Sequence, residues 1–332
     1  MSAVIRPSSG AEFARILSIA GYTPSRVVDN HEMTNYIETS DEWIQQRTGI
    51  IERRWVGEGE DLEQMSFAAG KLAIERSGIA AADIDAVIVA TVSYFHQTPS
   101  LAAILAHKLG TNGAAAFDIS AACAGFCYGV AQADALVRSG AARYVLVIGS
   151  EELSRMTNLN DRGTAFIFAD GAGAAVIGPS ETNGIGPVVW GSDGGQAGAI
   201  YQTADWPTAV ENADWPYLGM NGRDVFKWAT GFIAEAAKAT LEAAGVSPED
   251  LDVFIPHQAN NRITDAMLRS LKLPEHVVVA RTIKTLGNNS AASVPMAMDA
   301  VLASGEARSG QTALIIGFGA GLVYAGQVVT LP

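Results

Sequence analysis

The feature that most constrains the fold is an internal duplication in the 332-residue chain. Residues 78–90 (GIAAADIDAVIVA) resemble residues 245–257 (GVSPEDLDVFIPH), and residues 133–140 (ADALVRSG) resemble residues 298–305 (MDAVLASG). A third match joins VLVIGSE to ALIIGFG, and the three offsets, 167, 165 and 168 residues, are nearly equal. Such a repeat predicts two halves of the same topology that meet near residues 175–190.

Within each half, apolar runs rich in Val and Ile alternate with helical patterns, which indicates an α/β fold with a largely parallel sheet. We expect strands over residues 86–92, 115–119, 144–149, 252–256, 277–280 and 312–317, and paired helices over residues 60–77 and 222–244. Gly78 and Gly245 follow these helices, where a left-handed cap favours glycine. Val225, Trp228 and Phe232 fall on one apolar stripe, for which we predict core positions.

Composition and motifs argue against several classes of function. The net charge of −13 disfavours nonspecific binding to nucleic acid, because contact with phosphates needs clustered Lys and Arg. The sequence has no Walker loop, HExxH or EF-hand pattern, so neither a metal nor a nucleoside triphosphate is implied. Because the N-terminal residues lack the apolar core of a signal peptide, we expect a cytoplasmic protein. Residues 312–331 are uncharged and long enough to span a membrane, but their four glycines favour two buried strands.

The two cysteines, Cys123 and Cys127, lie in the stretch DISAACAGFCYGV. Their spacing fits neither a CxxC redox motif nor a paired zinc site. Cys123 follows a predicted strand and opens a stretch that continues as a helix, so unpaired backbone N–H groups and the helix dipole should favour its thiolate. Cys127 lies one turn further along the same face. We therefore predict Cys123 as the nucleophile and Cys127 as a packing residue.

Two other predicted strands lead to polar residues. His257 ends one of them, and Asn288 lies in LGNNSAASVP, where the 167-residue offset places Ser290 opposite Cys123. Because ligands of α/β sheets bind beyond the carboxyl ends of strands, these stretches could converge on one pocket. They would provide a thiol nucleophile and two hydrogen-bond donors for an oxygen. The glycines of GFGAG (317–321) indicate a close approach of the backbone to this pocket.

Five motifs occur in order: DEWIQQRTGI (41–50), FDISAACAGF (117–126), DRGTAFIFADGAGAAV (161–176), PHQANNRI (256–263) and LGNNSAASVP (286–295). With them the chain resembles the β-ketoacyl-acyl-carrier-protein synthase III family of the thiolase superfamily, and its actinobacterial members in particular. The resemblance implies an α/β, thiolase-like, five-layered αβαβα fold with two pseudo-symmetric halves. We expect residues 1–182 to form the half with the nucleophilic Cys, and residues 183–332 the half with His and Asn.

The resemblance also implies a reaction, the decarboxylative Claisen condensation of an acyl-CoA primer with malonyl-acyl carrier protein. Its product, a β-ketoacyl-acyl carrier protein, starts fatty acid or polyketide synthesis. Cys123 would accept the acyl group, and His257 and Asn288 would bind the thioester carbonyl of malonyl-acyl carrier protein. The N–H groups of Cys123 and of the Ala320 region would hold the oxyanion. Acyl-CoA is a substrate here, and no cofactor is implied.

Binding residues follow by the same resemblance. Trp43 and Arg162 would sandwich the CoA adenine, with Thr39 and Arg47 close by. The substrate tunnel would be lined by Phe226, Asn260 and Phe318. A basic patch of Lys227, Arg262, Arg269 and Lys272 beside the tunnel mouth would bind the acidic acyl carrier protein. In a homodimer, Thr98 would close the acyl pocket of the partner.

The chain departs from the family pattern in a few places. Asn289 stands where Thr is usual, FAD replaces the commoner FGD, and Ala320 interrupts a loop that is often all glycine. Residues 196–221, in which ADWP occurs twice, match no family motif. We expect this segment to border the acyl pocket or its entrance, which leaves the choice of primer open.

Three other functions remain open from the sequence. Relatives with this scaffold transfer acyl groups to hydroxyls or amines, and others are primer synthases of secondary metabolism. A Cys, His and Asn in this order also occur in cysteine hydrolases, so a thioester hydrolase is a further alternative.

Overall fold

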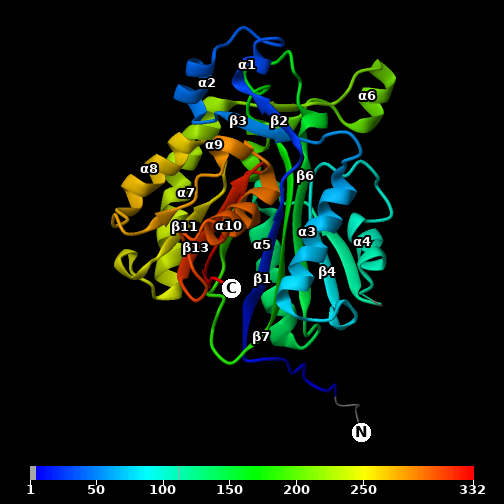
Figure 1. Ribbon diagram of the computed structural model, residues 1–332, viewed down its shortest axis with the longest axis vertical. Helices are drawn as coiled ribbons and strands as arrows, with labels where there is room; N and C mark the ends of the chain where they lie inside the picture. The colour runs from blue at the N-terminus through cyan, green and yellow to red at the C-terminus, as the bar shows by residue number, and fades with distance from the viewer. Residues whose placement is uncertain (1–4, 112) are drawn as a thin grey trace.

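The computed structural model describes residues 5–111 and 113–332, which form two five-stranded sheets and three layers of helices (Figure 1). The first sheet has the order β1-β7-β6-β4-β5 and comprises β1 (Phe13–Tyr22), β4 (Ala86–Ala90), β5 (Ala115–Ile119), β6 (Val145–Glu152) and β7 (Asp170–Ser180). The second has the order β8-β14-β13-β11-β12 and comprises β8 (Val189–Ser192), β11 (Val253–Pro256), β12 (Val278–Val279), β13 (Thr312–Gly319) and β14 (Val323–Thr330). Position by position the two orders correspond, as a duplicated chain requires.

The helices are also paired. The central layer is formed by α5 (Gly125–Ser139) and α10 (Ser293–Ala303), which both contribute to the largest apolar core. The first sheet is covered by α3 (Leu62–Ser77) and α4 (Leu101–Leu109), and the second by α7 (Gly222–Ala244) and α8 (Asn261–Leu271). Figure 1 shows these outer pairs on opposite sides of the molecule. This is the five-layered αβαβα arrangement expected from the sequence.

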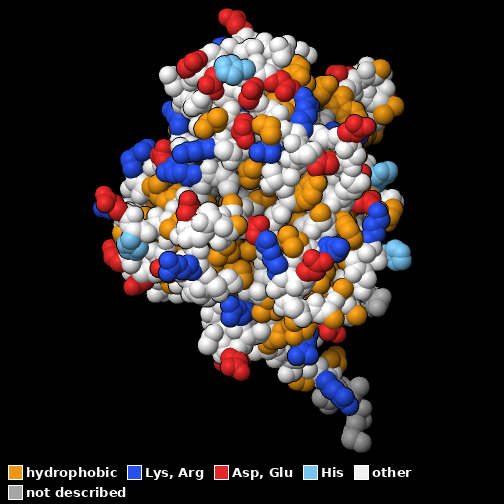
Figure 2. Space-filling view, in the orientation of Figure 1, with side chains coloured by type: hydrophobic (Ala, Val, Ile, Leu, Met, Phe, Trp, Pro, Cys, Tyr) orange, Lys and Arg blue, Asp and Glu red, His pale blue; other side chains and the backbone are white. Residues whose placement is uncertain are grey.

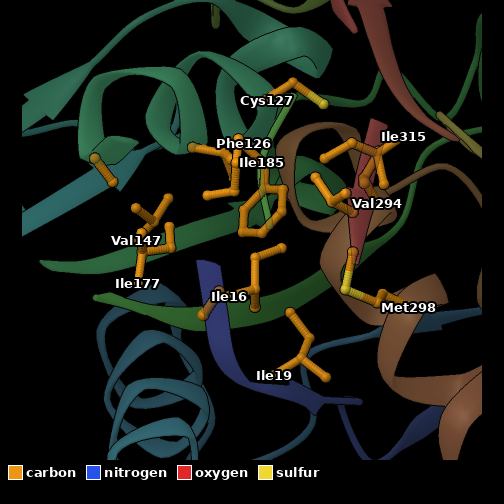
Figure 3. Packing of buried hydrophobic residues seen from close by; sticks show 14 of the residues in the cluster. Ile16, Ile19, Phe126, Cys127, Val147, Ile177, Ile185, Val294, Met298 and Ile315 are labelled. Carbon is orange, nitrogen blue, oxygen red and sulfur yellow. The ribbon is translucent and has the colours of Figure 1, made fainter. Parts of the chain in front are cut away.

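Successive side chains of each strand point to opposite faces of the sheet and so pack against different helix layers. In β6, Val145 and Val147 face the central layer, whereas Leu146 faces α3 and α4. Figure 3 shows Phe126 of α5 and Ile315 of β13 within the same apolar cluster of the central layer. Each fully buried aliphatic or aromatic side chain contributes about 1.5–3 kcal/mol relative to an exposed one, so this layer holds the halves together.

Most predicted elements are present with bounds shifted by one to three residues. The two first helices end at Gly78 and Gly245, whose φ angles of 71° and 67° give the expected left-handed caps. Residues 312–331 form the antiparallel pair β13 and β14, and no helix of the described residues is long and apolar enough to cross a bilayer. The prediction of largely parallel sheets is wrong: each sheet is mixed, since the strand pairs β6–β7 and β13–β14 are antiparallel.

Three shorter groups of elements complete the fold. One group covers one end of the sheets: β2 (Arg26–Asp29), α1 (Asn30–Met33), α2 (Asp41–Thr48), β3 (Glu52–Trp55) and α9 (Ile283–Leu286). The second is the unmatched segment, with β9 (Ile200–Gln202), α6 (Trp206–Asn212) and β10 (Leu218–Met220). Single helical turns, η2 (Ala122–Ala124) and η6 (Ser290–Ala292), precede α5 and α10. The division of the chain into domains at residue 182 stays a prediction.

Candidate active site

The predicted nucleophile and the two predicted donors line one cavity of about 110 Å³ between the halves. Cys123 lies in η2, after β5 of the first half. His257 follows β11, and Asn288 precedes η6, both in the second half. Three stretches that are separated by more than 30 residues therefore meet at the carboxyl ends of the strands.

The Cys123 turn and the Asn288 loop are equivalent parts of the two halves. Each turn begins with a non-glycine residue in the left-handed region, Ala122 with φ 43° and Ser290 with φ 46°. Ala122 and Ser290 are the first residues of η2 and η6 and are therefore equivalent. The 167-residue offset predicts a different partner for Ser290, namely Cys123, which is one residue later than Ala122. Backbone strain of this kind costs about 1–3 kcal/mol and is concentrated at functional sites.

The glycines of β13 let the Cys123 turn pack directly onto the strand. A Cβ atom at Gly319 would lie 2.8 Å from Cys123 Sγ, and one at Gly317 would lie 2.8 Å from the Cys123 carbonyl oxygen. No side chain fits at either position, which accounts for the GFGAG pattern as a close backbone approach. Phe318 and Ala320 line the cavity on either side of Gly319.

Burial is the largest influence on the acidity of Cys123. It raises the pKa of the Cys123 thiol to about 12, with a hydrogen bond from the Ser290 side chain acting in the opposite direction and the carboxylate of Glu151 adding to the increase. Burial therefore opposes the thiolate that the sequence predicts for this position. Cys127 is completely buried in the central core, as a packing residue should be.

His257 is buried and neutral. Burial lowers its pKa to about 3. Its Nδ1 atom lies 2.7 Å from Ser293 Oγ, and this oxygen also accepts a 3.4 Å hydrogen bond from the N–H of Gln258. When the Ser293 hydroxyl donates to Nδ1, the imidazole proton lies on Nε2, which is the tautomer that can donate a hydrogen bond to a ligand. The ring of Phe318 packs against His257 edge-on at 5.2 Å between centroids.

Asn288 is fixed by its own loop and by the other half of the molecule. Its Oδ1 accepts the N–H of Ser290 at 3.0 Å, which leaves Nδ2 as the donor of this side chain for a ligand. Its backbone N–H donates to Ile167 and its carbonyl accepts from Ala169, so the loop is bound to the first half. Asn289, the departure from the family pattern, directs its amide to the sulfur of Met296 in α10.

Much of the cavity wall was not predicted. Val225 and Trp228, expected in the core, line the cavity, and Phe232 of the same stripe is 49% exposed, so its core prediction is wrong. Phe232 instead packs flat against Trp228. The remaining apolar lining comes from residues whose patterns are those of ordinary core positions, namely Val92, Leu153, Ile167, Phe168, Ile200, Leu218, Met220 and Ile263.

The unmatched segment borders the cavity, as expected, through Ile200, Leu218 and Met220. Its repeated ADWP pattern also has a structural reason. Trp206 and Trp215, one from each copy, pack edge to face at 5.4 Å between centroids. Both rings also contact Phe95, so the two copies anchor α6 to the first half.

The residues expected to bind CoA are arranged around Trp43. Arg47 and Arg162 lie over its ring at 5.0 and 4.9 Å, and Arg162 also donates to the carbonyl of Glu38. An aromatic base can lie between Trp43 and Arg162 only if the arginine moves. Neighbouring Thr39 is partly buried.

Two more predicted residues connect this group to the cavity. Asn260 lines the cavity and donates from Nδ2 to the carbonyl of Arg47. Phe226 also lines the cavity, and the guanidinium of Arg262 covers its ring at 5.2 Å.

The expected basic patch is exposed, whereas Thr98 lies apart from the cavity. All four residues are exposed: Lys227 lies on α7, Arg262 and Arg269 lie on α8, and Lys272 directly follows α8. Figure 2 shows basic side chains over the side of the molecule where Figure 1 places α2 and α8. Thr98 is exposed and does not line the cavity of its own chain.

Comparison with known proteins bears on the identity of this site. The family model described as 3-oxoacyl-[acyl-carrier-protein (ACP)] synthase III matches residues 117–194, and the model of its C-terminal part matches residues 241–331. β-Ketoacyl-[acyl-carrier-protein] synthase III 1 of Streptomyces coelicolor is 55% identical over 340 residues, with 99% of each chain covered. The synthase III of Streptomyces glaucescens is also 55% identical, over 330 residues. The chain belongs to the 3-oxoacyl-[acyl-carrier-protein] synthase III family.

Solved structures agree with this membership. The priming β-ketosynthase of a polyketide biosynthetic pathway superposes with a TM-score of 0.96 at 44% identity and covers 100% of this chain and 99% of its own. The synthase III of Pseudomonas aeruginosa has a TM-score of 0.90 at 32% identity, with 97% and 99% covered. Membership in the synthase III family confirms the thiolase-like fold and makes this chain an acyltransferase of the condensing type.

Proposed function

We propose that this chain condenses an acyl-CoA primer with malonyl-acyl carrier protein to give a β-ketoacyl-acyl carrier protein. The observation that carries the proposal is the meeting of one thiol and two neutral donors in a narrow apolar cavity. Acyl-CoA serves as a substrate, and no step of this reaction calls for a resident cofactor. We place the reaction in the cytoplasm, in a homodimer.

In the first step Cys123 Sγ attacks the thioester carbonyl of acyl-CoA as its S–H bond breaks. The bond to the CoA sulfur then breaks, and the CoA thiolate takes up the proton and leaves as a thiol. The backbone N–H groups of Cys123 and of the Ala320 region hold the oxyanion of the tetrahedral intermediate. The acyl chain then lies against the apolar wall, where each buried methylene contributes about 0.8 kcal/mol.

In the second step His257 and Asn288 act on malonyl-acyl carrier protein. Loss of CO2 leaves an electron pair that is delocalised onto the thioester oxygen, to which His257 Nε2 and Asn288 Nδ2 donate hydrogen bonds. Because the pKa of His257 is lowered to about 3, it stays a neutral donor throughout the neutral pH range. The carbanion attacks the acyl-cysteine carbonyl, and the Cys123 thiolate leaves.

CoA and the carrier protein would bind through residues outside the group of Cys123, His257 and Asn288. Trp43, Arg47, Thr39 and Arg162 provide a site for the CoA adenine, and Phe226, Asn260 and Phe318 line the path of the pantetheine. Lys227, Arg262, Arg269 and Lys272 present positive charge to an acidic carrier protein in spite of the net charge of −13.

One observation favours polyketide priming as a specific version of this function. The priming β-ketosynthase named above shares 44% identity and a TM-score of 0.96 with this chain. The condensation chemistry would be the same, and only the primer and the carrier protein would differ.

Release of CO2 tests the proposal. Enzyme, acyl-CoA and carboxyl-labelled malonyl-acyl carrier protein should release labelled CO2 together with a β-ketoacyl product, and Cys123→Ala should abolish the condensation. Cys127→Ser, in a buried position without a proposed role, is the matched control for a cysteine replacement. Release of free acid without malonyl-acyl carrier protein would instead identify a thioester hydrolase, and acyl transfer to an alcohol or amine would identify one of the other acyltransferases.

A further inference from the structure

Glu151, near the end of β6, is a completely buried carboxylate beside the cavity. Its Oε2 accepts hydrogen bonds from Ser93 Oγ at 2.6 Å, the N–H of Val92 at 3.1 Å and Thr91 Oγ1 at 3.2 Å. Its Oε1 accepts one from Ser290 Oγ at 3.0 Å. Among the ion pairs of the described residues, none involves Glu151. Burial of a carboxylate without a cation is costly, so its retention here calls for a reason.

Ser290 connects this carboxylate to the predicted nucleophile. The residue lines the cavity, and its left-handed backbone is held by the bond from its N–H to Asn288 Oδ1. Its side chain lines the same cavity as Cys123, and its hydroxyl acts to lower the pKa of the thiol. A hydroxyl has a single proton, which Ser290 donates to Glu151. Its oxygen can then accept the S–H proton of the Cys123 thiol, and Ser290 can donate to the sulfur only when its own proton turns away from Glu151. The three groups thus form a chain from sulfur to carboxylate.

We propose that Glu151 is a positioning residue that accepts the Cys123 proton through Ser290 when the thiol is acylated. The inference rests on the proposed role of Cys123 as nucleophile. As the S–H bond breaks, Sγ uses its electron pair to bond to the thioester carbonyl carbon. Ser290 Oγ takes that proton and passes its own to Glu151. The departing CoA thiolate is the final proton acceptor, which restores the carboxylate.

The surroundings of Glu151 suit this role. Burial raises the pKa of Glu151 to about 7, against the effect of its hydrogen bonds, so the group can gain and lose a proton near neutrality. The groups that face the carboxyl are the side chains of Thr91, Ser93 and Ser290, the N–H of Val92 and, beyond Ser290, the thiol of Cys123; of these only the thiol titrates. Below its pKa Glu151 is protonated and cannot accept the proton, so acylation should slow as the pH falls.

Single-turnover acylation by acetyl-CoA, followed from about pH 5 to pH 9, tests the proposal. In the wild type the rate should rise with pH through about 7, the pKa of Glu151. Glu151→Gln should be roughly 100-fold slower, in the range of general acid–base effects, and should lose this inflection. Ser290→Ala should behave in the same way, and the double variant should be no slower than either single variant, because all three interrupt one path. Glu151→Asp should restore the inflection.

Glu152→Gln is the matched control. Burial also raises the pKa of this neighbouring carboxyl to about 7, but its side chain pairs with Arg155, whereas Ser290 Oγ bonds to Glu151. This variant should keep the wild-type pH profile. An unchanged profile in a folded Glu151→Gln protein, its loss in Glu152→Gln, or additive effects of Glu151→Gln and Ser290→Ala would each overturn the proposal. If wild-type Cys123 takes no acyl group at all, the proposed function itself fails.

Discussion

At the scale of single residues, Cys123 and His257 both owe their protonation states to burial. The pKa of the thiol is raised to about 12 and that of the imidazole is lowered to about 3, so both are uncharged at neutral pH. A neutral pair tolerates an apolar cavity better than an ion pair without further partners would. The cavity can therefore hold an acyl chain, with the charge appearing only during reaction.

His257→Ala and Asn288→Ala should impair decarboxylation far more than acylation. Both side chains are assigned to the thioester oxygen of the malonyl group, and loss of one such donor reduces rates by about 100- to 1,000-fold. Single-turnover acylation of Cys123 should stay within about tenfold of the wild type. The measurement compares the rate of acyl-enzyme formation with the rate of CO2 release. Equal losses in both steps would contradict the division of roles.

Residue types at strand ends could be predicted from the sequence, but their environments could not. The positions of Cys123, His257 and Asn288 follow from the apolar runs before them and from the repeat. The neutral state of Cys123 depends on the total packing around it, which no local pattern encodes. Glu151 was missed for the same reason, because it follows an apolar strand and its partners Thr91 and Ser290 are distant in sequence.

At the scale of elements, β13 determines how closely the Cys123 turn approaches the second half. Gly319→Ala would place a Cβ atom 2.8 Å from both Cβ and Sγ of Cys123, where one of the two elements has to shift. We expect acylation to fall at least tenfold, because small displacements of reacting groups are costly. Gly231→Ala is the control, since a Cβ atom there meets nothing within 4 Å on the exposed side of α7. Wild-type acylation in Gly319→Ala would contradict the close-packing account.

The helices α7 and α8 carry the charges proposed to meet the carrier protein. Arg262→Glu should raise KM for malonyl-acyl carrier protein about tenfold and change KM for acyl-CoA less, since the patch addresses the acidic partner. The effect should shrink as salt is added, because exposed charges are screened. Arg308→Glu, an exposed position after α10, controls for the change in net charge. Equal changes for both substrates, or no dependence on salt, would argue against this docking surface.

Elements with strong periodicity and caps were predictable, and irregular ones were not. The helix α7 was predicted with its observed bounds because an apolar stripe and a final glycine define it. The segment that contains β9, α6 and β10 has no such pattern, and its tryptophans become informative only when they meet Phe95. Periodicity also places Phe232 on the same helix face as Trp228. It does not show that this face becomes exposed to solvent at Phe232.

At the scale of the whole molecule, the duplication explains why one site forms between two halves. Each half supplies one strained turn, and the mixed sheets place both turns at the same end of the central helices α5 and α10. The repeat in the sequence predicted the equivalent loops. It left the pairing by residue open, because the offset is 167 residues at the preceding strands, β4 and β11, and 168 at the turns, where Ser290 matches Ala122.

The proposed dimer leads to a prediction about the primer. If Thr98 closes the acyl pocket of a partner subunit, Thr98→Phe should shorten that pocket and shift kcat/KM toward acetyl-CoA over isobutyryl-CoA. Each methylene that no longer fits costs about 0.8 kcal/mol, or roughly fourfold in specificity. Thr98→Ser, which keeps a small side chain, should leave the ratio unchanged. A monomer in solution, or the same ratio in Thr98→Phe, would show that Thr98 does not limit the pocket.

The central claim is that Cys123 carries the acyl group that malonyl-acyl carrier protein then removes. Peptide mass spectrometry of the enzyme after brief incubation with a short acyl-CoA tests it most directly. The acyl mass should appear on the peptide at Cys123 and not on Cys127, and a chase with malonyl-acyl carrier protein should remove it with release of one CO2 per acyl group. An adduct on Cys127, acylation that persists in Cys123→Ala, or an acyl group that water removes without malonyl-acyl carrier protein would contradict the account.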